Sequence, residues 1–297
     1  MTTLPKFQPD SKPVAIIGAG TLGSRIALML SSSGGEVRIF DKNPNQLQVA
    51  KRFVEAEMPH LVESRKCARA GRLVLSTDLR STIGDVWMVV EAIPERVALK
   101  SELFGELDRL TPKTTILASN SSSFPSSQFI DRVEHKERVV NTHYYMPPQQ
   151  NAVEIMSCGH TDEEILDALF DRFPLYGLVP FRVLKESVGF IFNRIWAAVK
   201  RECLAVVAEG VSSPSEVDRM FQVNLGTHGG PFRLMDKVGL DVVLDIEEHY
   251  AAIRPGIPVG PRDLLKKYVA EGKLGVKSAR GFYTDYSATT TDSGQLA

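Results

Sequence analysis

Short apolar runs alternate with longer amphipathic stretches through the first half of the chain. The apolar runs, each of which predicts a buried strand, cover residues 13–17, 36–40, 72–75, 87–92, 115–118 and 139–142. Helical periodicity occupies residues 45–66, where we expect a break near Pro59, and residues 96–110. Strands that alternate with helices predict an α/β fold with a doubly wound parallel sheet of the Rossmann type.

The pattern changes after residues 181–183, which fit a last strand. Beyond them, helical patterns cover residues 190–209, 216–223, 232–238, 241–253 and 262–271. Ser213 begins a Ser-Pro-Ser-Glu capping box ahead of the second of these helices. We therefore expect a Rossmann-type α/β domain over 1–186 and an all-α domain over 187–297. The helix predicted over 190–209 is almost wholly apolar, which favours its burial against a second copy in a homodimer.

Composition and charge exclude several classes of protein. The chain is 43% hydrophobic and 24% charged, as ordinary globular proteins are, and its net charge of −1 argues against nucleic-acid binding. No apolar run is long enough for a bilayer, and the ends show no secretory, transit, peroxisomal or retention signal. Residues 287–295 predict a frayed tail. We expect a cytoplasmic protein without a membrane partner.

The three cysteines do not suggest a special role. Cys67, Cys158 and Cys203 lie far apart, without metal-ligand spacing, and their odd number suits a reducing compartment. We expect no metal site.

A glycine-rich turn follows the first predicted strand. Gly18 permits the tight turn, Gly20 lets the backbone approach a pyrophosphate, and Gly23 allows close packing of helix on strand. The predicted cofactor loop consists of Gly18, Gly20, Thr21, Leu22 and Gly23. The alternative is a glycine turn without a ligand.

The residue after the second strand bears on the choice of cofactor. Asp41 stands about 20 residues beyond the glycines, where an acid binds the adenosine ribose. A carboxylate there favours NAD over NADP, because it repels a 2′-phosphate; Lys42 beside it weakens that preference.

Three further polar residues, Glu95, Ser122 and His143, follow predicted strands. The carboxyl ends of parallel strands meet at one edge of a sheet, where ligands bind. His143 and Glu154 belong to the stretch NTHYYMPPQQNAVEIM, residues 141–156. Its residues alone leave two interpretations: an acid–base couple, or a loop histidine with a glutamate that faces water on a half-exposed strand.

Taken together and in order, the motifs resemble the 3-hydroxyacyl-CoA dehydrogenase family, whose relatives include the lambda-crystallin/L-gulonate and carnitine dehydrogenases. They are VAIIGAGTLGSRIA, VVEAIPERVALKSELF, ASNSSSF, THYYMPP with AVEIM, SVGFIFNRI, LGTHGGPFRLMDKVGLD and LGVKSARGFYTDY. The resemblance implies an NAD-binding domain followed by a helical dimerisation domain.

The resemblance also implies catalytic roles. His143 matches the family's catalytic histidine and Glu154 its glutamate partner. Ser122 matches a serine that hydrogen-bonds the substrate oxygen and the histidine, and Asn193 an asparagine that orients the substrate carbonyl. Plain helix caps are the alternatives for Ser122 and Asn193.

Three residues are expected on the cofactor side. Glu95 and Lys100, in PERVALK, match residues that line the nicotinamide side of the site, and Asn120 precedes Ser122 in ASNSSSF. Hydride transfer between a nicotinamide and an alcohol leaves one proton to be moved. An imidazole such as that of His143 suits this transfer because it gains or loses a proton near neutral pH.

The chain departs from the family on the substrate side. Met146 stands where the family has an asparagine, the loop between His143 and Glu154 is shorter, and the LGTHGGPF stretch is shortened as well. The segment between the second and third strands is compact.

We predict an NAD(H)-dependent oxidoreductase of fatty acid metabolism that interconverts 3-hydroxyacyl and 3-oxoacyl thioesters of CoA or a carrier protein. The alternatives are a dehydrogenase of a free hydroxy acid, such as gulonate or carnitine, and a catalytically silent, crystallin-like NAD-binding protein.

Overall fold

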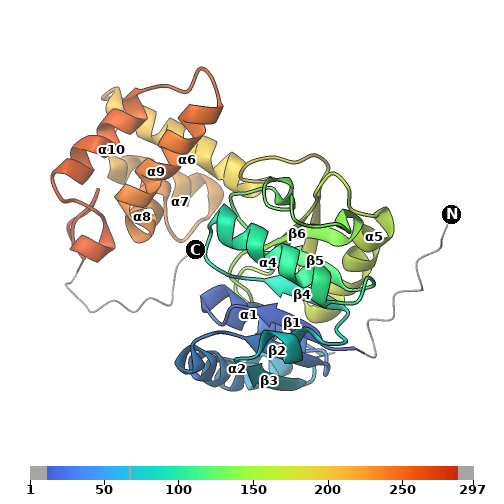
Figure 1. Ribbon diagram of the computed structural model, residues 1–297. Coiled ribbons are helices and arrows are strands. Elements are labelled where there is room, and N and C mark those ends of the chain that lie inside the picture. The colour runs from blue at the N-terminus through green and yellow to red at the C-terminus, as the bar shows by residue number, and fades with distance from the viewer. Residues whose placement is uncertain (1–11, 67, 287–297) are drawn as a thin grey trace. The chain divides into compact units, whose positions relative to one another are not determined.

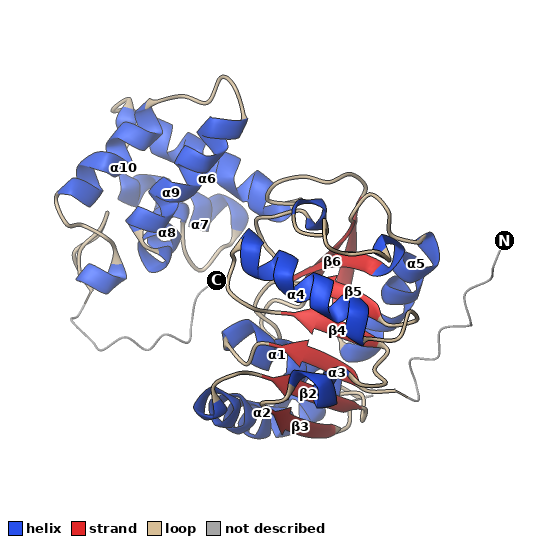
Figure 2. Cartoon of the chain, in the orientation of Figure 1, coloured by secondary structure: helices blue, strands red, loops and turns tan. Residues whose placement is uncertain are grey.

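The chain forms two compact units. The computed structural model describes residues 12–66 and 68–286, so Cys67 and the predicted tail lie outside the described residues. Contacts divide the chain into Met1–Ile191 and Phe192–Ala297, where the sequence predicted a boundary at residue 186. The described strands belong to the first unit, and the second is built from helices (Figures 1 and 2).

Within the described residues, eight strands form one sheet in the order β3-β2-β1-β4-β5-β6-β7-β8. The strands are β1 Val14–Ile17, β2 Glu36–Phe40, β3 Arg72–Ser76, β4 Met88–Glu91, β5 Ile116–Ser119, β6 Val139–Tyr144, β7 Ala152–Ser157 and β8 Val179–Val183. Strands β1 to β6 pair in parallel, as do β7 and β8. The doubly wound sheet predicted from the sequence is confirmed.

One strand corrects the prediction of a parallel sheet. β7 pairs with β6 in the antiparallel sense, with His143 opposite Glu154. The connection over residues 145–151 is too short for the crossover helix that a parallel pair requires.

Helices cover both faces of this sheet. They are α1 Thr21–Ser31, α2 Pro44–Ser64, α3 Leu79–Ile83, α4 Val97–Leu110 and α5 Glu163–Arg172. Because side chains alternate along a strand, Ile16 packs with the buried side chains of α1, α2 and α5, whereas Ile17 packs with those of α3 and α4. Both faces are therefore buried, as parallel sheets require.

The predicted break in α2 is wrong. The helix runs through Pro59 to Ser64. Val54, Met58 and Leu61 form a buried stripe on either side of the proline, and this packing maintains the helix despite the missing N–H.

The second unit contains α6 Phe192–Ala208, α7 Pro214–Leu225, α8 Pro231–Val238, α9 Leu240–Ile253 and α10 Gly260–Ala270. Ser213 caps α7 by accepting the N–H of Glu216, as its capping box predicted. None of the helices over residues 12–66 and 68–286 has the length and apolar character needed to cross a membrane. The homodimer stays a prediction.

Two buried aspartates explain the glycine-rich stretches of this unit. Asp218 accepts the N–H groups of Phe232 and Arg233 at the start of α8, where a carboxylate is favoured. Asp236 likewise accepts the N–H groups of Phe282 and Tyr283. LGTHGGPF and ARGFY thus owe their positions to contacts within the unit.

A buried ion pair between α6 and α9 leads to a stability prediction. Arg201 donates to both oxygens of Glu247, at 2.6 and 3.3 Å, and Glu247 is fully buried. We expect Glu247→Ala to lower the free energy of unfolding by about 3–5 kcal/mol, because it leaves a buried cation unpaired. Glu248, its neighbour, pairs with Arg262 and Lys266 near the surface, where water screens the charges, so Glu248→Ala should lower the free energy of unfolding much less. Urea unfolding of both variants provides the comparison, and equal losses would contradict it.

Candidate active site

The glycine turn between β1 and α1 combines two kinds of glycine. Gly18 has φ +109°, and a Cβ there would lie 2.4 Å from the Ala92 carbonyl oxygen; a Cβ on Gly23 would lie 1.9 Å from the carbonyl oxygen of Gly18. A Cβ on Gly20 would meet no atom within 4 Å. The fold itself requires Gly18 and Gly23, whereas the space at Gly20 is open to a ligand.

Asp41 holds this turn from the end of β2. Its Oδ2 accepts the N–H of Ala19 at 2.9 Å, and its Oδ1 accepts the N–H of Asn43 at 2.9 Å. Thr21 and Leu22 open α1, where backbone N–H groups lack helical partners and attract anions. The turn therefore fits the pyrophosphate of a dinucleotide.

A buried carboxylate lies at the end of β4. Glu91 accepts hydrogen bonds from the Ile93 N–H, Lys100 Nζ and Ser119 Oγ at 2.6–2.8 Å. Lys100 is 1% exposed and also contacts Glu95 at 3.1 Å. Lys100, which the sequence placed on the cofactor side, is thus enclosed between two carboxylates and positions Glu95.

Glu95 in turn orders the serine loop that follows β5. Its Oε1 accepts Ser121 Oγ at 2.5 Å and the N–H groups of Ser122 and Ser123 at 3.2 and 3.0 Å. Burial acts to raise the pKa of Glu95, but Lys100 and these donors together hold that pKa below its usual range. Glu95 therefore serves as an anionic anchor for the loop.

The serine loop brings two predicted residues to the edge of the sheet. Asn120 accepts the Tyr144 N–H at 2.9 Å and so extends the contact between β5 and β6. Ser121, and not Ser122, caps the turn by accepting the Phe124 N–H. Among the described residues, no hydrogen bond joins Ser122 to His143, and Asn193 lies in the first turn of α6 in the second unit.

His143 and Glu154 form a buried pair. Nδ1 of His143 lies 2.9 Å from Oε2 of Glu154, and the two residues are 5% and 2% exposed. A glutamate that faces water is therefore excluded. Since an ionised carboxylate only accepts hydrogen bonds, Nδ1 carries the hydrogen and Nε2 is left to exchange a proton with a ligand.

Three more groups surround this pair. The Ile191 N–H donates to Oε1 of Glu154 at 2.8 Å, and the Tyr145 hydroxyl donates to Oε2 at 2.9 Å. The ring of Phe190 lies 5.1 Å from that of His143, and Phe190 adopts φ +52°, an uncommon conformation for a residue with a side chain. Tyr145, Phe190 and Ile191 were not predicted as site residues, although they lie within the motifs THYYMPP and SVGFIFNRI.

Arg25 supports the rebuilt loop after β6. It is 8% exposed and donates to the Pro147 carbonyl oxygen at 2.9 Å and to Gln149 Oε1 at 2.7 Å. Its guanidinium lies over the ring of Phe53. The sequence analysis missed Arg25, although a single arginine within the apolar stretch of α1 was a visible signal.

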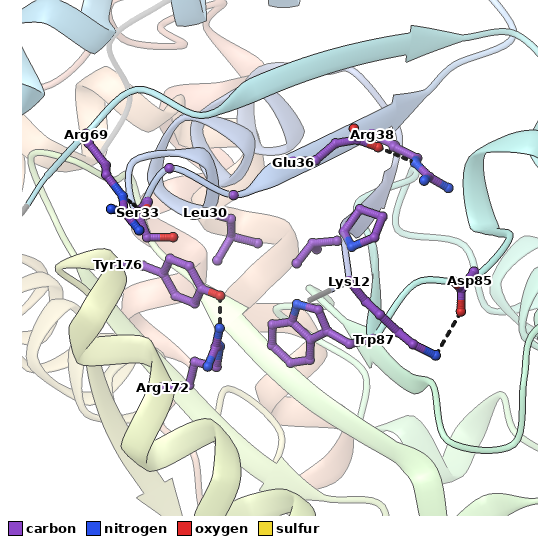
Figure 3. Close-up of a pocket in the computed structure, with 14 residues that line it drawn as sticks. Lys12, Leu30, Ser33, Glu36, Arg38, Arg69, Asp85, Trp87, Arg172 and Tyr176 are labelled. Atoms are coloured by element: carbon purple, nitrogen blue, oxygen red, sulfur yellow. Dashed lines mark hydrogen bonds and ion pairs between the residues drawn. The ribbon is translucent and has the colours of Figure 1, made fainter. Parts of the chain in front are cut away.

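A hollow of about 570 Å³ lies at the opposite edge of the sheet, where β1, β2 and β4 begin (Figure 3). Its charged groups already have partners within the chain: Lys12 pairs with Asp85, Arg38 with Glu36, and Arg172 donates to the Tyr176 hydroxyl. The predicted site residues of the first unit lie at the other edge, where the parallel strands have their carboxyl ends. We therefore assign the site to that carboxyl edge and not to the hollow. No group of metal-ligating side chains occurs in the described part of the chain.

Comparison with known proteins agrees with this arrangement. Residues 13–187 match the family model of the 3-hydroxyacyl-CoA dehydrogenase NAD-binding domain, and residues 189–285 match that of the C-terminal domain. The chain belongs to the 3-hydroxyacyl-CoA dehydrogenase family. The resemblance predicted from the sequence is confirmed, and with it a nicotinamide dinucleotide cofactor.

Individual relatives cover nearly the whole chain. A probable 3-hydroxybutyryl-CoA dehydrogenase of Bacillus subtilis is 33% identical over 95% of this chain and 100% of its own length. The human mitochondrial hydroxyacyl-coenzyme A dehydrogenase is 30% identical, over 92% and 90%. The solved (S)-3-hydroxybutyryl-CoA dehydrogenase of Ralstonia eutropha is 28% identical over 93% and 99%, with a TM-score of 0.83. Membership confirms the prediction of an oxidoreductase of this type.

The two kinds of glycine lead to a paired prediction. Gly23→Ala should lower the melting temperature, because its methyl group collides with the Gly18 carbonyl. Gly20→Ala should keep the melting temperature but weaken NADH binding at least about tenfold, because the added methyl occupies the approach to the pyrophosphate. Differential scanning calorimetry and NADH fluorescence titration measure the two effects; unchanged NADH affinity in Gly20→Ala would contradict the assigned cofactor position.

Proposed function

We propose that the protein interconverts 3-hydroxyacyl and 3-oxoacyl thioesters with NAD(H), and that His143 and Glu154 handle the proton. The observation that carries the proposal is the buried 2.9 Å contact between these residues at the strand end, in a chain of this family. When bound, the nicotinamide supplies or accepts the hydride. The chain itself must then bind the substrate oxygen and move one proton.

His143 is suited to that proton. In the reducing direction the imidazolium donates from Nε2 to the substrate oxygen, and in the oxidising direction the neutral ring accepts it. Glu154 holds the ring in one tautomer and stabilises its positive charge. Ser122 and Asn193 are proposed to donate hydrogen bonds to the same oxygen, where charge develops.

NAD is proposed as the physiological cofactor. Both oxygens of Asp41 accept backbone N–H groups, and we propose that they lie beside the adenosine end of the cofactor. A carboxylate at that position disfavours a 2′-phosphate.

The cofactor preference has its own test. The ratio of the NADPH to the NADH dissociation constant should fall about tenfold in Asp41→Asn, equivalent to about 1.4 kcal/mol, because the repulsion is removed. Lys42→Gln, the control at the neighbouring position, should increase the ratio. Fluorescence titration gives both constants. The loss of one backbone hydrogen bond affects the two cofactors alike, so an unchanged ratio in Asp41→Asn would count against this role.

The carrier of the acyl group is proposed to be CoA. Similar proteins with this activity by name, in Bacillus subtilis and Ralstonia eutropha, are 3-hydroxybutyryl-CoA dehydrogenases, and they match almost the whole chain. A carrier protein presents the same thioester, so both must be compared.

The proposal predicts that acetoacetyl-CoA oxidises NADH. The loss of absorbance of the reduced nicotinamide measures this reaction. His143→Gln should lower kcat by about 10²–10⁴-fold and keep NADH affinity, because only the proton step is affected. His60→Gln, an exposed histidine on α2, is the matched control and should keep full activity.

The alternative functions are tested in the same assay with further substrates. These are a β-ketoacyl carrier protein, and gulonate or carnitine with NAD. Turnover of gulonate or carnitine, and of no thioester, would establish the protein as a dehydrogenase of a free hydroxy acid. Binding of NADH without turnover of any substrate would contradict the proposed reaction and favour a silent NAD-binding protein.

A further inference from the structure

The Tyr145 hydroxyl occupies a position that the proposed chemistry does not yet use. Its oxygen lies 2.9 Å from Oε2 of Glu154, the same oxygen that lies 2.9 Å from Nδ1 of His143. Tyr145 directly follows β6, two residues after His143, and the ring centroids of the two residues are 4.6 Å apart. The three side chains therefore form one contiguous group.

Tyr145 is the donor in this contact. Burial raises the pKa of its phenol well above the usual range, and the Glu154 carboxylate raises it further. This environment favours the neutral phenol, which donates its hydrogen to the carboxylate. The Ile191 N–H occupies the other carboxylate oxygen at 2.8 Å, so both oxygens of Glu154 accept hydrogen bonds.

Two donors on one oxygen compete with each other. A hydrogen bond from a neutral phenol stabilises the carboxylate charge without adding a positive charge. The carboxylate then attracts the imidazolium of His143 less strongly than it would with a single donor. The hydroxyl also restricts rotation of the carboxylate, which keeps Oε2 directed at Nδ1.

We propose that Tyr145 is a positioning residue, which fixes the Glu154 carboxylate and weakens its hold on the charged form of His143. The direction of its effect follows. Without the hydroxyl, Glu154 stabilises the imidazolium more strongly, so His143 keeps its proton to higher pH. This inference rests on the proposed function only where it concerns turnover.

Other ionisable groups lie on the elements around β6 and β7. They should affect the titration of His143 equally with and without the Tyr145 hydroxyl, because their charged partners are the same in both cases. These groups are Glu91 and Glu95, which both contact Lys100; Glu186, which accepts the Ser127 N–H; and Arg182, which pairs with Glu163 and Asp167.

Tyr145→Phe tests the proposal directly, because it keeps the ring against His143 and removes only the hydroxyl. NMR titration of the His143 imidazole in the protein with no substrate, assigned with His143→Gln, gives its titration midpoint. We expect the midpoint to rise by roughly 0.5–1 pH unit, less than the 1–3 units of a full neighbouring charge. Tyr144→Phe is the matched control; its ring packs on the opposite face with Phe173, so it should leave the midpoint unchanged.

A second variant covers the case in which Tyr145→Phe does not fold. Replacing Tyr145 with 3-fluorotyrosine makes the phenol a stronger donor, so the midpoint should fall. An unchanged or opposite shift in a folded variant, as judged by circular dichroism, overturns the proposal.

Turnover provides a readout that a merely structural role would not move. Oxidation requires neutral His143 and reduction requires the imidazolium, so the limb of each pH profile that reports this group should move to higher pH in Tyr145→Phe. A uniform loss in both directions without movement of either limb also overturns the proposal. If the NMR midpoint shifts but no acyl thioester is turned over, the proposed function fails and the role of Tyr145 stands.

Discussion

The antiparallel pairing of β6 with β7 determines what the active site can do. His143 and Glu154 are eleven residues apart in sequence, yet they are direct cross-strand neighbours. Cross-strand pairs have their Cβ atoms about 5 Å apart, which is the separation at which a histidine and a glutamate can share a hydrogen bond within a sheet. A parallel β7 would place the glutamate elsewhere. The pair is therefore rigid, because the backbone ladder positions both residues.

Carboxylates organise the loops around this pair; Glu91 and Glu154 are buried, whereas Glu95 is exposed and Asp41 is half-buried. Glu91 and Glu95 order the serine loop, Asp41 orders the glycine turn, and Glu154 fixes the residues that leave the first unit. Each accepts backbone N–H groups that have no partner in regular structure, which compensates for the burial of the charge. The same device recurs at Asp218 in the second unit. Charge-assisted hydrogen bonds thus hold these loops in place.

Sequence patterns predicted most of the framework, because buried strands and amphipathic helices produce strong periodic signals. The strand over 36–40 and the helix starts near Val97 and Pro231 show how closely those signals follow the structure. The direction of β7 left no periodic signal, because it depends on the length of the connection. Pro59 was misleading, since tertiary packing outweighed a local propensity.

At the site, the predictable residues were those in motifs. Gly18, Gly23 and His143 are dictated by backbone space or chemistry and so appear as motifs. Arg25 acts through hydrogen bonds to Pro147 and Gln149, which are 122 and 124 positions away. Tyr145 acts through its hydrogen bond to Glu154 on the neighbouring strand. Such contacts exist only after folding, so no local sequence pattern indicates them.

The bond between Glu154 and the Ile191 N–H has a consequence for how this chain can be recombined with others. The two family matches meet at residues 187–189, which suggests a natural place to join halves from different relatives. The residues that contact the histidine pair, however, continue to Ile191, and Phe190 needs its left-handed backbone to fit there. A functional hybrid should therefore be joined after Ile191, so that one parent supplies the whole segment that the carboxylate holds.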